Sequence, residues 1–277
     1  MNIDEFAQAW QQDNEFFYKD NSREFWDSTA QRFNQRFVNN TNGIHNMNTD
    51  GLMAFLQQRN ILTAETNVLD IGCGPGRFTR EFAKTANHVT AIDISSNMIQ
   101  LAKQNTAEEY LDHADYEATD WKFLDLAARG WQKKYDLVFA SMTPGISGID
   151  TLLKMCEAGK GYCFMSGFIS RKDEVADQLH RVVFGEDPKP RGKHLYYALN
   201  ILFLSGYYPE IMYNYSERKQ ELALEEAIET YSAAFKKRNA EDNGLRDRVA
   251  GYLERVAVNG TIAEKACSKI AWIIWKV

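Results

Sequence analysis

The sequence has 277 residues, of which 44% are apolar and 25% charged, a composition typical of a globular protein with a substantial core. Its 32 Lys and Arg against 38 Asp and Glu give a net charge of −6 and a pI near 5.5. This balance argues against duplex nucleic acid as the main partner but leaves a local basic patch open. The four cysteines lack metal-ligand spacing, and no apolar run is long enough for a signal segment or membrane span. We therefore expect reduced buried thiols, no metal site and a cytoplasmic protein.

Residues 1–60 are predicted to form a helical cap. Aromatic residues recur among Gln, Asn and charged residues from Phe6 to Phe37, and Leu52, Phe55 and Leu56 mark a helix before the first strand. Aromatic residues at such spacing more often pack against their own domain than line a ligand site.

The most informative stretch is Asn67 to Arg80, N-V-L-D-I-G-C-G-P-G-R-F-T-R. Its apolar run ends near Asp70, three glycines follow on alternate positions, and apolar residues then recur at helical spacing. A strand, a glycine turn and a helix start place a nucleotide-like ligand at the N-terminus of a helix. The glycines let the backbone turn sharply and approach that ligand closely.

This turn favours one cofactor over another. A dinucleotide fingerprint requires a small residue at the position of Arg77. The acid Asp70 would repel a pyrophosphate but suits the ammonium group of an amino acid. The motif D-I-G-C-G-P-G therefore resembles motif I of the class I S-adenosylmethionine-dependent methyltransferases, and an NAD(P)-dependent oxidoreductase is the least favoured alternative.

The next segments fit a nucleotide-binding α/β unit. His88 to Asp93 is predicted as the second strand, and Asp93 stands where such a unit places an acid on the ribose hydroxyls. The alternative, that Asp93 caps the following helix, is less favoured because Ser95 and Ser96 can serve as its N-cap. The third strand is predicted at 119–124. The resemblance implies that the acid after it, Asp125 with Asp120 as a competitor, bonds the adenine.

The remaining chain completes a seven-stranded pattern. Strands are predicted at 135–141, 161–168, 209–215 and 269–277, with helices at 149–160 and 195–204. Residues 171–194 are predicted as a loop-rich insertion and 217–256 as a charged helical one, both within a methyltransferase domain spanning 61–277. The fold class is α/β, a Rossmann-like, mostly parallel sheet with helices on both faces. The resemblance implies a last strand antiparallel to the fifth.

The resemblance also implies two sets of site residues. The cofactor side comprises Asp70, Gly72, Cys73, Gly74, Gly76, Asp93, Ile94, Met98, Asp125, Leu126 and Ser141. The substrate side comprises Trp26 and Phe33, from an aromatic segment that in the family folds over the cofactor, with Met142, Thr143, Arg171 and Tyr196. His194 is the candidate proton acceptor, and an exposed or hydrogen-bonded histidine is the alternative.

These expectations describe a cytoplasmic enzyme that transfers a methyl group from S-adenosylmethionine to a small molecule by in-line displacement, leaving S-adenosylhomocysteine. Met142-Thr143-Pro144 departs from the D/N-P-P-Y/F motif of enzymes that methylate DNA bases or glutamine, which disfavours those acceptors. An RNA methyltransferase and a non-catalytic S-adenosylmethionine-binding protein are the alternatives. The acceptor atom is unspecified, and a homodimer is open.

Overall fold

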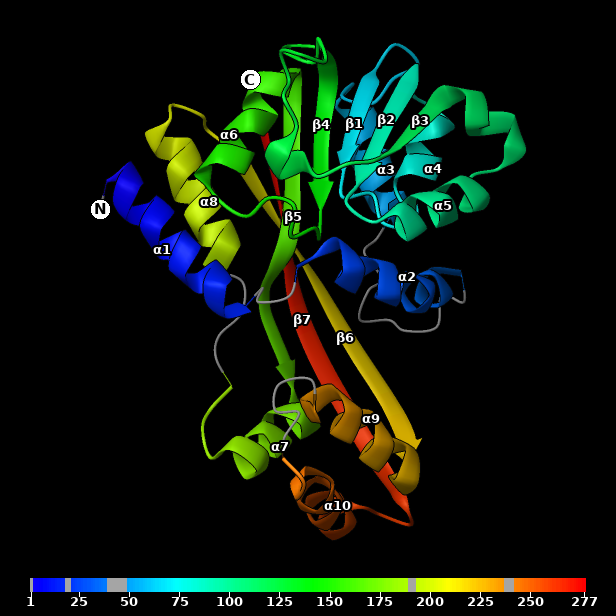
Figure 1. The fold of residues 1–277 in the computed structure, drawn as a ribbon, viewed down its shortest axis with the longest axis vertical. Helices are drawn as coiled ribbons and strands as arrows, with labels where there is room; N and C mark the ends of the chain where they lie inside the picture. The colour runs from blue at the N-terminus through cyan, green and yellow to red at the C-terminus, as the bar shows by residue number, and fades with distance from the viewer. Residues whose placement is uncertain (1, 18–20, 39–48, 189–192, 237–241) are drawn as a thin grey trace.

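A computed structural model describes residues 2–17, 21–38, 49–188, 193–236 and 242–277 (Figure 1). Its centre is a seven-stranded sheet in the order β3-β2-β1-β4-β5-β7-β6. The strands are β1 (Asn67–Ile71), β2 (His88–Asp93), β3 (Ala114–Ala118), β4 (Tyr135–Ser141), β5 (Gly159–Asp173), β6 (Glu210–Ala223) and β7 (Thr261–Lys276). β1 to β5 pair in parallel, and β7 lies antiparallel between β5 and β6. The predicted fold class, including the antiparallel last strand, is confirmed.

Helices cover both faces of the sheet because β1 and β4 are apolar on both sides. Val68 and Phe139 pack toward α3 (Thr49–Gln58) and α4 (Thr79–Ala83), with α5 (Ser96–Asn105) beside them over β2. Leu69 and Val138 pack toward α1 (Ile3–Phe17), α6 (Ile149–Ala158) and α8 (Lys193–Leu204). The two faces form separate apolar cores, and the carboxyl ends of β1, β2 and β4 open at one edge between them.

The last three strands continue far beyond this edge. Ser141, the last residue of β4, pairs with Ser166, which pairs with Trp272. Past this level we call the strand segments 167–173, 213–223 and 261–271 the arm. At about 3.3 Å per residue, the β7 segment of the arm extends about 35 Å. The arm thus projects from the sheet edge where parallel α/β proteins bind ligands (Figure 1).

Three helices cap the far end of the arm and form what we call the lobe: α7 (Glu174–Phe184), α9 (Leu224–Lys236) and α10 (Leu245–Val256). Their apolar residues make a core of their own that includes Leu179, Ile228 and Val249. A polar cluster ties this core to the arm. Buried Glu264 on β7 accepts hydrogen bonds from the Tyr231 hydroxyl at 2.5 Å and the Gln220 amide at 2.5 Å.

Four secondary-structure predictions were wrong. The third strand lies at Ala114–Ala118, while 121–123 forms the short 3-10 helix η3 (Trp121–Phe123). The insertion at 171–194 contains the end of β5 and α7 rather than loop alone, and its residues 189–192 lie outside the described ranges. The predicted helix at 217–256 begins as strand through Ala223, and the described part of the rest is α9 and α10. β6 and β7 are both longer than predicted.

The incorrect helix prediction for residues 217–223 has a physical reason. Residues 217–223 (E-R-K-Q-E-L-A) are good helix formers with no apolar alternation, yet each pairs with β7, from Glu217 with Cys267 to Ala223 with Thr261. Pairing with a neighbouring strand overrides a weak local preference.

The N-terminal helices do not form one cap over one surface. α1 packs on α8 through Trp10 and Tyr197, whereas α2 (Arg23–Val38) packs on α5. α3 belongs to the core under the sheet, through Leu52 and Leu56. None of the helices in the described ranges has the length and apolar character needed to span a membrane.

Candidate functional site

The glycine turn after β1 is held against β2. The backbone N–H groups of Gly72 and Cys73 both donate to the carbonyl of Ile92, at 2.8 and 3.0 Å. A Cβ on Gly76 would lie 3.0 Å from Ala102, so this glycine allows α5 to pack close. A Cβ on Gly74 would meet no atom within 4 Å, and Gly74 has a φ of +55°. The turn therefore presents bare backbone to an open space at the sheet edge.

Asp93, at the end of β2, is bonded to this turn. One carboxylate oxygen accepts from the Gly74 N–H at 2.9 Å and the other from the Ser95 N–H at 2.9 Å. Burial raises the pKa of Asp93, while these two hydrogen bonds oppose the rise. Each oxygen keeps a further lone pair, so the carboxylate can still accept from two neighbouring hydroxyls. The glycine turn and the predicted ribose-binding acid are thus brought together.

Asp70 is the buried acid of the site. Burial raises its pKa to about 7, the hydrogen bond from the Thr79 hydroxyl at 2.6 Å opposes the rise, and the charge of Asp93 adds to it. A carboxyl group in this state gains most from a cationic partner, which would favour its ionised form. Cys73 lies nearby, but its side chain packs with Ala91 and Ile99, so only its backbone faces the turn.

Ile94 and Met98, which were both predicted on the cofactor side, differ in exposure. Ile94 is half-buried and lies directly after Asp93. Met98 is buried against Ala30 and Leu101, between α5 and α2. Ile94 is therefore the one with surface at the edge of the site.

The shifted third strand moves the candidate adenine acid. Asp120 follows the end of β3 by two residues, and the N–H of its neighbour Thr119 donates to the Asp93 carbonyl at 2.8 Å. Asp125 is exposed and caps a turn by accepting from Ala127 N–H, and Leu126 is buried in the core. The strand that Asp125 and Leu126 were predicted to follow lies at 114–118 instead, so Asp120 is the acid that comes after β3, and its contact with the adenine stays a prediction.

The segment after β4 lies over the glycine turn. Ser141 Oγ is 2.8 Å from Ser166 Oγ, and the Met142 N–H donates to the Ser166 carbonyl. Met142 has a φ of +55°, an uncommon conformation for a residue with a side chain. A Cβ on Gly72 would collide with the Thr143 hydroxyl. Ser141, predicted on the cofactor side, and Met142 and Thr143, predicted on the substrate side, therefore belong to one segment that lies against the glycine turn.

The N-terminal aromatics Trp26 and Phe33 pack on α5, in a cluster with Met98 and Leu101. This is the packing alternative rather than a free substrate wall. A residue that the sequence did not single out holds this helix: Asp27 accepts from the Ser95 hydroxyl at 2.5 Å and the Asn97 N–H at 3.1 Å. No local pattern marks Asp27, because its partners lie about 70 residues away.

His194 lies in the first turn of α8, against the backbone of β5. A Cβ on Gly167 would collide with its Nε2, so only glycine at 167 leaves room for the ring. Burial lowers the pKa of His194 to about 4, so the imidazole is neutral at physiological pH. Tyr196, two residues further along α8, is 55% exposed, and its ring contacts Phe6 of α1. The Tyr196 ring therefore lies away from the position of His194.

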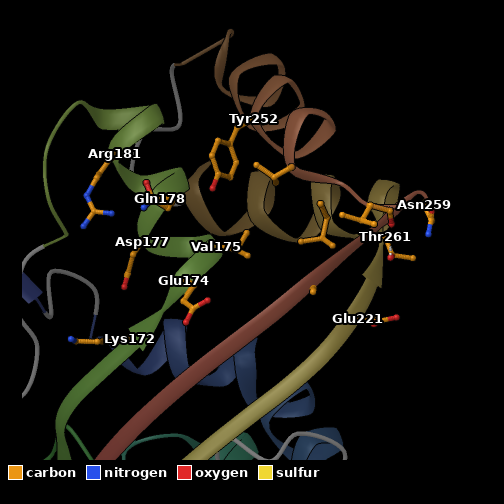
Figure 2. Close-up of a pocket in the computed structure, with 14 residues that line it drawn as sticks. Lys172, Glu174, Val175, Asp177, Gln178, Arg181, Glu221, Tyr252, Asn259 and Thr261 are labelled. Atoms are coloured by element: carbon orange, nitrogen blue, oxygen red, sulfur yellow. Dashed lines mark hydrogen bonds between the residues drawn. The ribbon is translucent and has the colours of Figure 1, made fainter.

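The neighbouring residues Arg171 and Lys172 on the arm have side chains that point in opposite directions. Arg171 pairs with Ser268 and Lys172 with Cys267, so their side chains leave opposite faces of the sheet. Lys172 lines a hollow of about 1070 Å³ between the arm, α7 and α10, together with Glu174, Asp177 and Tyr252 (Figure 2). This hollow lies in the lobe, away from the glycine turn. No cluster of metal-ligating side chains occurs in the described ranges.

Residues 62–182 match a family model described as a methyltransferase domain. Residues 62–182 therefore carry a methyltransferase domain. The chain is 39% identical over 101 residues to a ubiquinone biosynthesis O-methyltransferase of Pasteurella multocida, covering 34% of this chain and 41% of that protein. It is 37% identical over 93 residues to a 23S rRNA (uracil(1939)-C(5))-methyltransferase of Tolumonas auensis, covering 33% of this chain and 21% of that protein. The chain thus spans less than half the length of these curated relatives.

Solved structures share the fold of the methyltransferase domain. The magnesium protoporphyrin IX methyltransferase of Synechocystis PCC 6803 superposes with a TM-score of 0.53 at 18% identity, covering 70% of this chain and 91% of that one. The YcgJ protein of Bacillus subtilis superposes with a TM-score of 0.50 at 13% identity, covering 83% and 97%.

The residues present fit S-adenosylmethionine, the cofactor that the glycine turn predicts. The open space at Gly74 accommodates a ligand against bare backbone. Asp70 suits the ammonium group of its methionine part, and Asp93 retains acceptor capacity for ribose hydroxyls.

Proposed function

We propose that this chain transfers a methyl group from S-adenosylmethionine to an oxygen atom of a small-molecule acceptor by in-line displacement. The observation that carries the proposal is the convergence of Asp70, Gly74 and Asp93 at the carboxyl ends of β1 and β2. Support for an oxygen acceptor comes from the similar proteins named as O-methyltransferases of ubiquinone biosynthesis and of malonyl-[acyl-carrier protein].

Bound S-adenosylmethionine supplies an activated methyl group with its leaving group attached, so the protein contributes mainly by position. Holding two reactants in line can remove on the order of 7–11 kcal/mol of a barrier. Asp70 would hold the ammonium group of the cofactor and Asp93 its ribose hydroxyls, and the loop at Met142 and Thr143 lies against the glycine turn.

His194 is proposed to take the proton from an acceptor hydroxyl. Its ring is neutral and desolvated, and among the described residues no hydrogen bond occupies it. The neutral ring has a nitrogen lone pair for this proton, but a pKa of about 4 makes it a weak base before ligands bind, because general-base assistance, typically about 10²–10⁴-fold, is greatest when the pKa lies near the operating pH.

Cofactor binding tests the proposal directly. Calorimetric titration with S-adenosylhomocysteine should show tight binding, with none for NADH. Asp93→Ala should weaken that binding by about 10- to 100-fold, because hydrogen bonds to a charged group contribute roughly 1.5–3 kcal/mol. Asp125→Ala is the matched control and should bind normally, since Asp125 caps an exposed turn. Binding of NADH, or of neither ligand, would refute the cofactor assignment.

The role of His194 predicts a pH profile. With a panel of phenols and carboxylic acids as acceptors, product formation should be independent of histidine titration above about pH 5, because the pKa of His194 is about 4. His194→Gln should lower kcat on phenols about 100-fold or more while S-adenosylhomocysteine binds as before. His88→Gln, which removes a surface contact with Asp115, is the control. An unchanged kcat in His194→Gln would remove the proposed base.

A further inference from the structure

The two outer strands of the sheet have very different edges. β3 has 5 residues, whereas β6 has 14, all paired with β7, and within the described ranges no further strand pairs with the other side of β6 (Figure 1). In an antiparallel edge strand, every second residue directs its N–H and C=O groups away from the sheet. β6 therefore offers a long row of main-chain donors and acceptors to another strand.

Half of this edge lacks the protection that edge strands usually have. Proteins block such edges with charged residues, proline or bulges. From Ile211 to Ser216, β6 has none of these, and it presents Tyr213 at 55% and Tyr215 at 72% exposure. From Glu217 to Glu221 the strand is charged instead. A partner strand must therefore pair with aromatic residues at one end and with charges of both signs at the other.

A second copy of the same strand meets both requirements. Because an antiparallel pair runs in opposite directions, the aromatic half of one β6 lies opposite the charged half of the other. Two registers pair nearly the whole strand: one with the two-fold axis at Glu217 and one with it at Ser216. The first places Glu217 directly opposite Glu217 of the second copy, and like charges in that position are destabilising.

The register centred on Ser216 has no like-charge pair from Glu210 to Leu222. It places Tyr213 opposite Lys219 of the second copy, a pairing that allows a cation–π contact. It places Tyr215 opposite Glu217, a pair that can form a hydrogen bond across the strands, and Asn214 opposite Arg218, whose guanidinium already bonds Gln220 and Glu264 within its own copy. Every one of these pairs occurs twice, because the two-fold axis repeats it.

We propose that two copies of this chain pair through β6 in this register, joining their sheets into one continuous sheet with a two-fold axis at Ser216. Such an isologous two-fold interface is the commonest form of homo-oligomer. It involves the edge of the arm and not the glycine turn, so each copy keeps its own cofactor site. The inference concerns assembly and stands apart from the proposed methyl transfer.

The mass of the full chain in solution tests the assembly. Light scattering behind size exclusion should give twice the chain mass of 31.8 kDa. Ser216→Glu places two carboxylates together on the axis and should give the monomer mass. Ser170→Glu is the matched control: Ser170 is equally half-buried on the arm but pairs with Lys269, away from the free edge, and this variant should remain a dimer.

A cysteine cross-link tests the register without a new charge. In a Cys267→Ser background, which removes the one thiol that is not buried, Ser216→Cys should form an intermolecular disulfide under mild oxidant. Opposed residues have Cβ atoms about 4.5–5.5 Å apart. Asn214→Cys should form none, because Asn214 and its copy lie four residues out of register. A monomeric wild-type chain would overturn the proposal, as would a dimer that survives Ser216→Glu and gives no cross-link in the Ser216→Cys variant.

Discussion

At the scale of single residues, the site is organised around two carboxyl groups in different environments. Asp93 accepts two backbone hydrogen bonds and is half-buried, whereas Asp70 is 2% exposed and bonds one hydroxyl. Burial dominates at Asp70 and raises its pKa to about 7. Near neutral pH this carboxyl group is thus only partly ionised on its own, and a cationic ligand would complete its ionisation.

Asp70 should make stability depend on pH. Its folded-state pKa of about 7 lies above the ordinary 3.8. The stability that the protonated Asp70 carboxyl contributes to the folded state is therefore fully present below pH 3.8 and is lost as the pH rises through 7. Asp70→Asn keeps the shape and cannot ionise. Without ligand, its free energy of unfolding at pH 8 should exceed that of the wild type by up to about 4 kcal/mol, with little difference at pH 4. Urea unfolding at both pH values measures this.

The control for that comparison has the opposite sign. Burial alone would raise the pKa of Asp136, but hydrogen bonds from Asn67 and Lys160 outweigh it and lower the pKa. Asp136→Asn should therefore lose stability at pH 8. If Asp70→Asn instead behaves like Asp136→Asn, the Asp70 carboxyl is held ionised by a partner in the folded state.

At the scale of elements, α2 connects the N-terminal region to the cofactor side. Asp27 of α2 accepts hydrogen bonds from Ser95 and Asn97 at the start of α5. Because Ser95 comes directly after Asp93 and Ile94, α2 lies next to this part of the cofactor side. Further along, Asn34 accepts from Asn105, whose amide also donates to the carbonyl of Pro75 in the glycine turn. These hydrogen bonds thus link α2, through α5, to both sides of the glycine turn.

Removing the hydrogen bonds of Asp27 should weaken cofactor binding. Asp27→Ala deletes two hydrogen bonds of a capping carboxylate, and losing such a cap costs about 0.5–2 kcal/mol. S-adenosylhomocysteine binding should weaken several-fold, and hydrogen exchange in α2 should accelerate. Glu24→Ala, an exposed acid in the first turn of the same helix, should change neither. Unchanged binding in Asp27→Ala would mean that α2 packs beside the site without supporting it.

At the scale of the whole molecule, the arm joins the sheet, which has an apolar core on each face, to the lobe, which has a core of its own. The cores on either face of the sheet contain the site, and the lobe has its own core around Leu179, Ile228 and Val249. The link between lobe and arm includes a buried polar cluster around Glu264. Such an arrangement allows the lobe to open without unfolding the sheet.

Hydrogen exchange should reveal this division. Amides of α9 and α10 should exchange through an opening of lower free energy than those of β1 and β4. Tyr231→Phe removes one donor from buried Glu264 and should lower the opening free energy of α9 by roughly 1–3 kcal/mol, leaving β1 unchanged. Tyr252→Phe, in α10 beside the hollow, is the control. Equal acceleration in lobe and sheet would mean that the molecule unfolds as one unit.

Local sequence determined the segments whose conformation depends mainly on residues close to them in the chain. The run from Asn67 to Gly76 specifies a buried strand and a glycine turn, and positive φ values at Gly72, Gly74 and Gly76 require that residue type. The apolar runs of β2 and β4, with Asp93 at the end of β2, also follow from local composition. These segments predict the sheet, the cofactor and the two acids proposed to bind it.

Tertiary structure decided what depends on distant partners. Residues 217–223 are strand because β7 lies beside them, and β3 pairs with β2 only as far as Ala118, so Asp120 rather than Asp125 follows it. Trp26 and Phe33 turn toward α5 because Asp27 meets Ser95, 68 residues away. The arm, the lobe and the free edge of β6 arise from such long-range pairings, whose free energy local propensities do not contain.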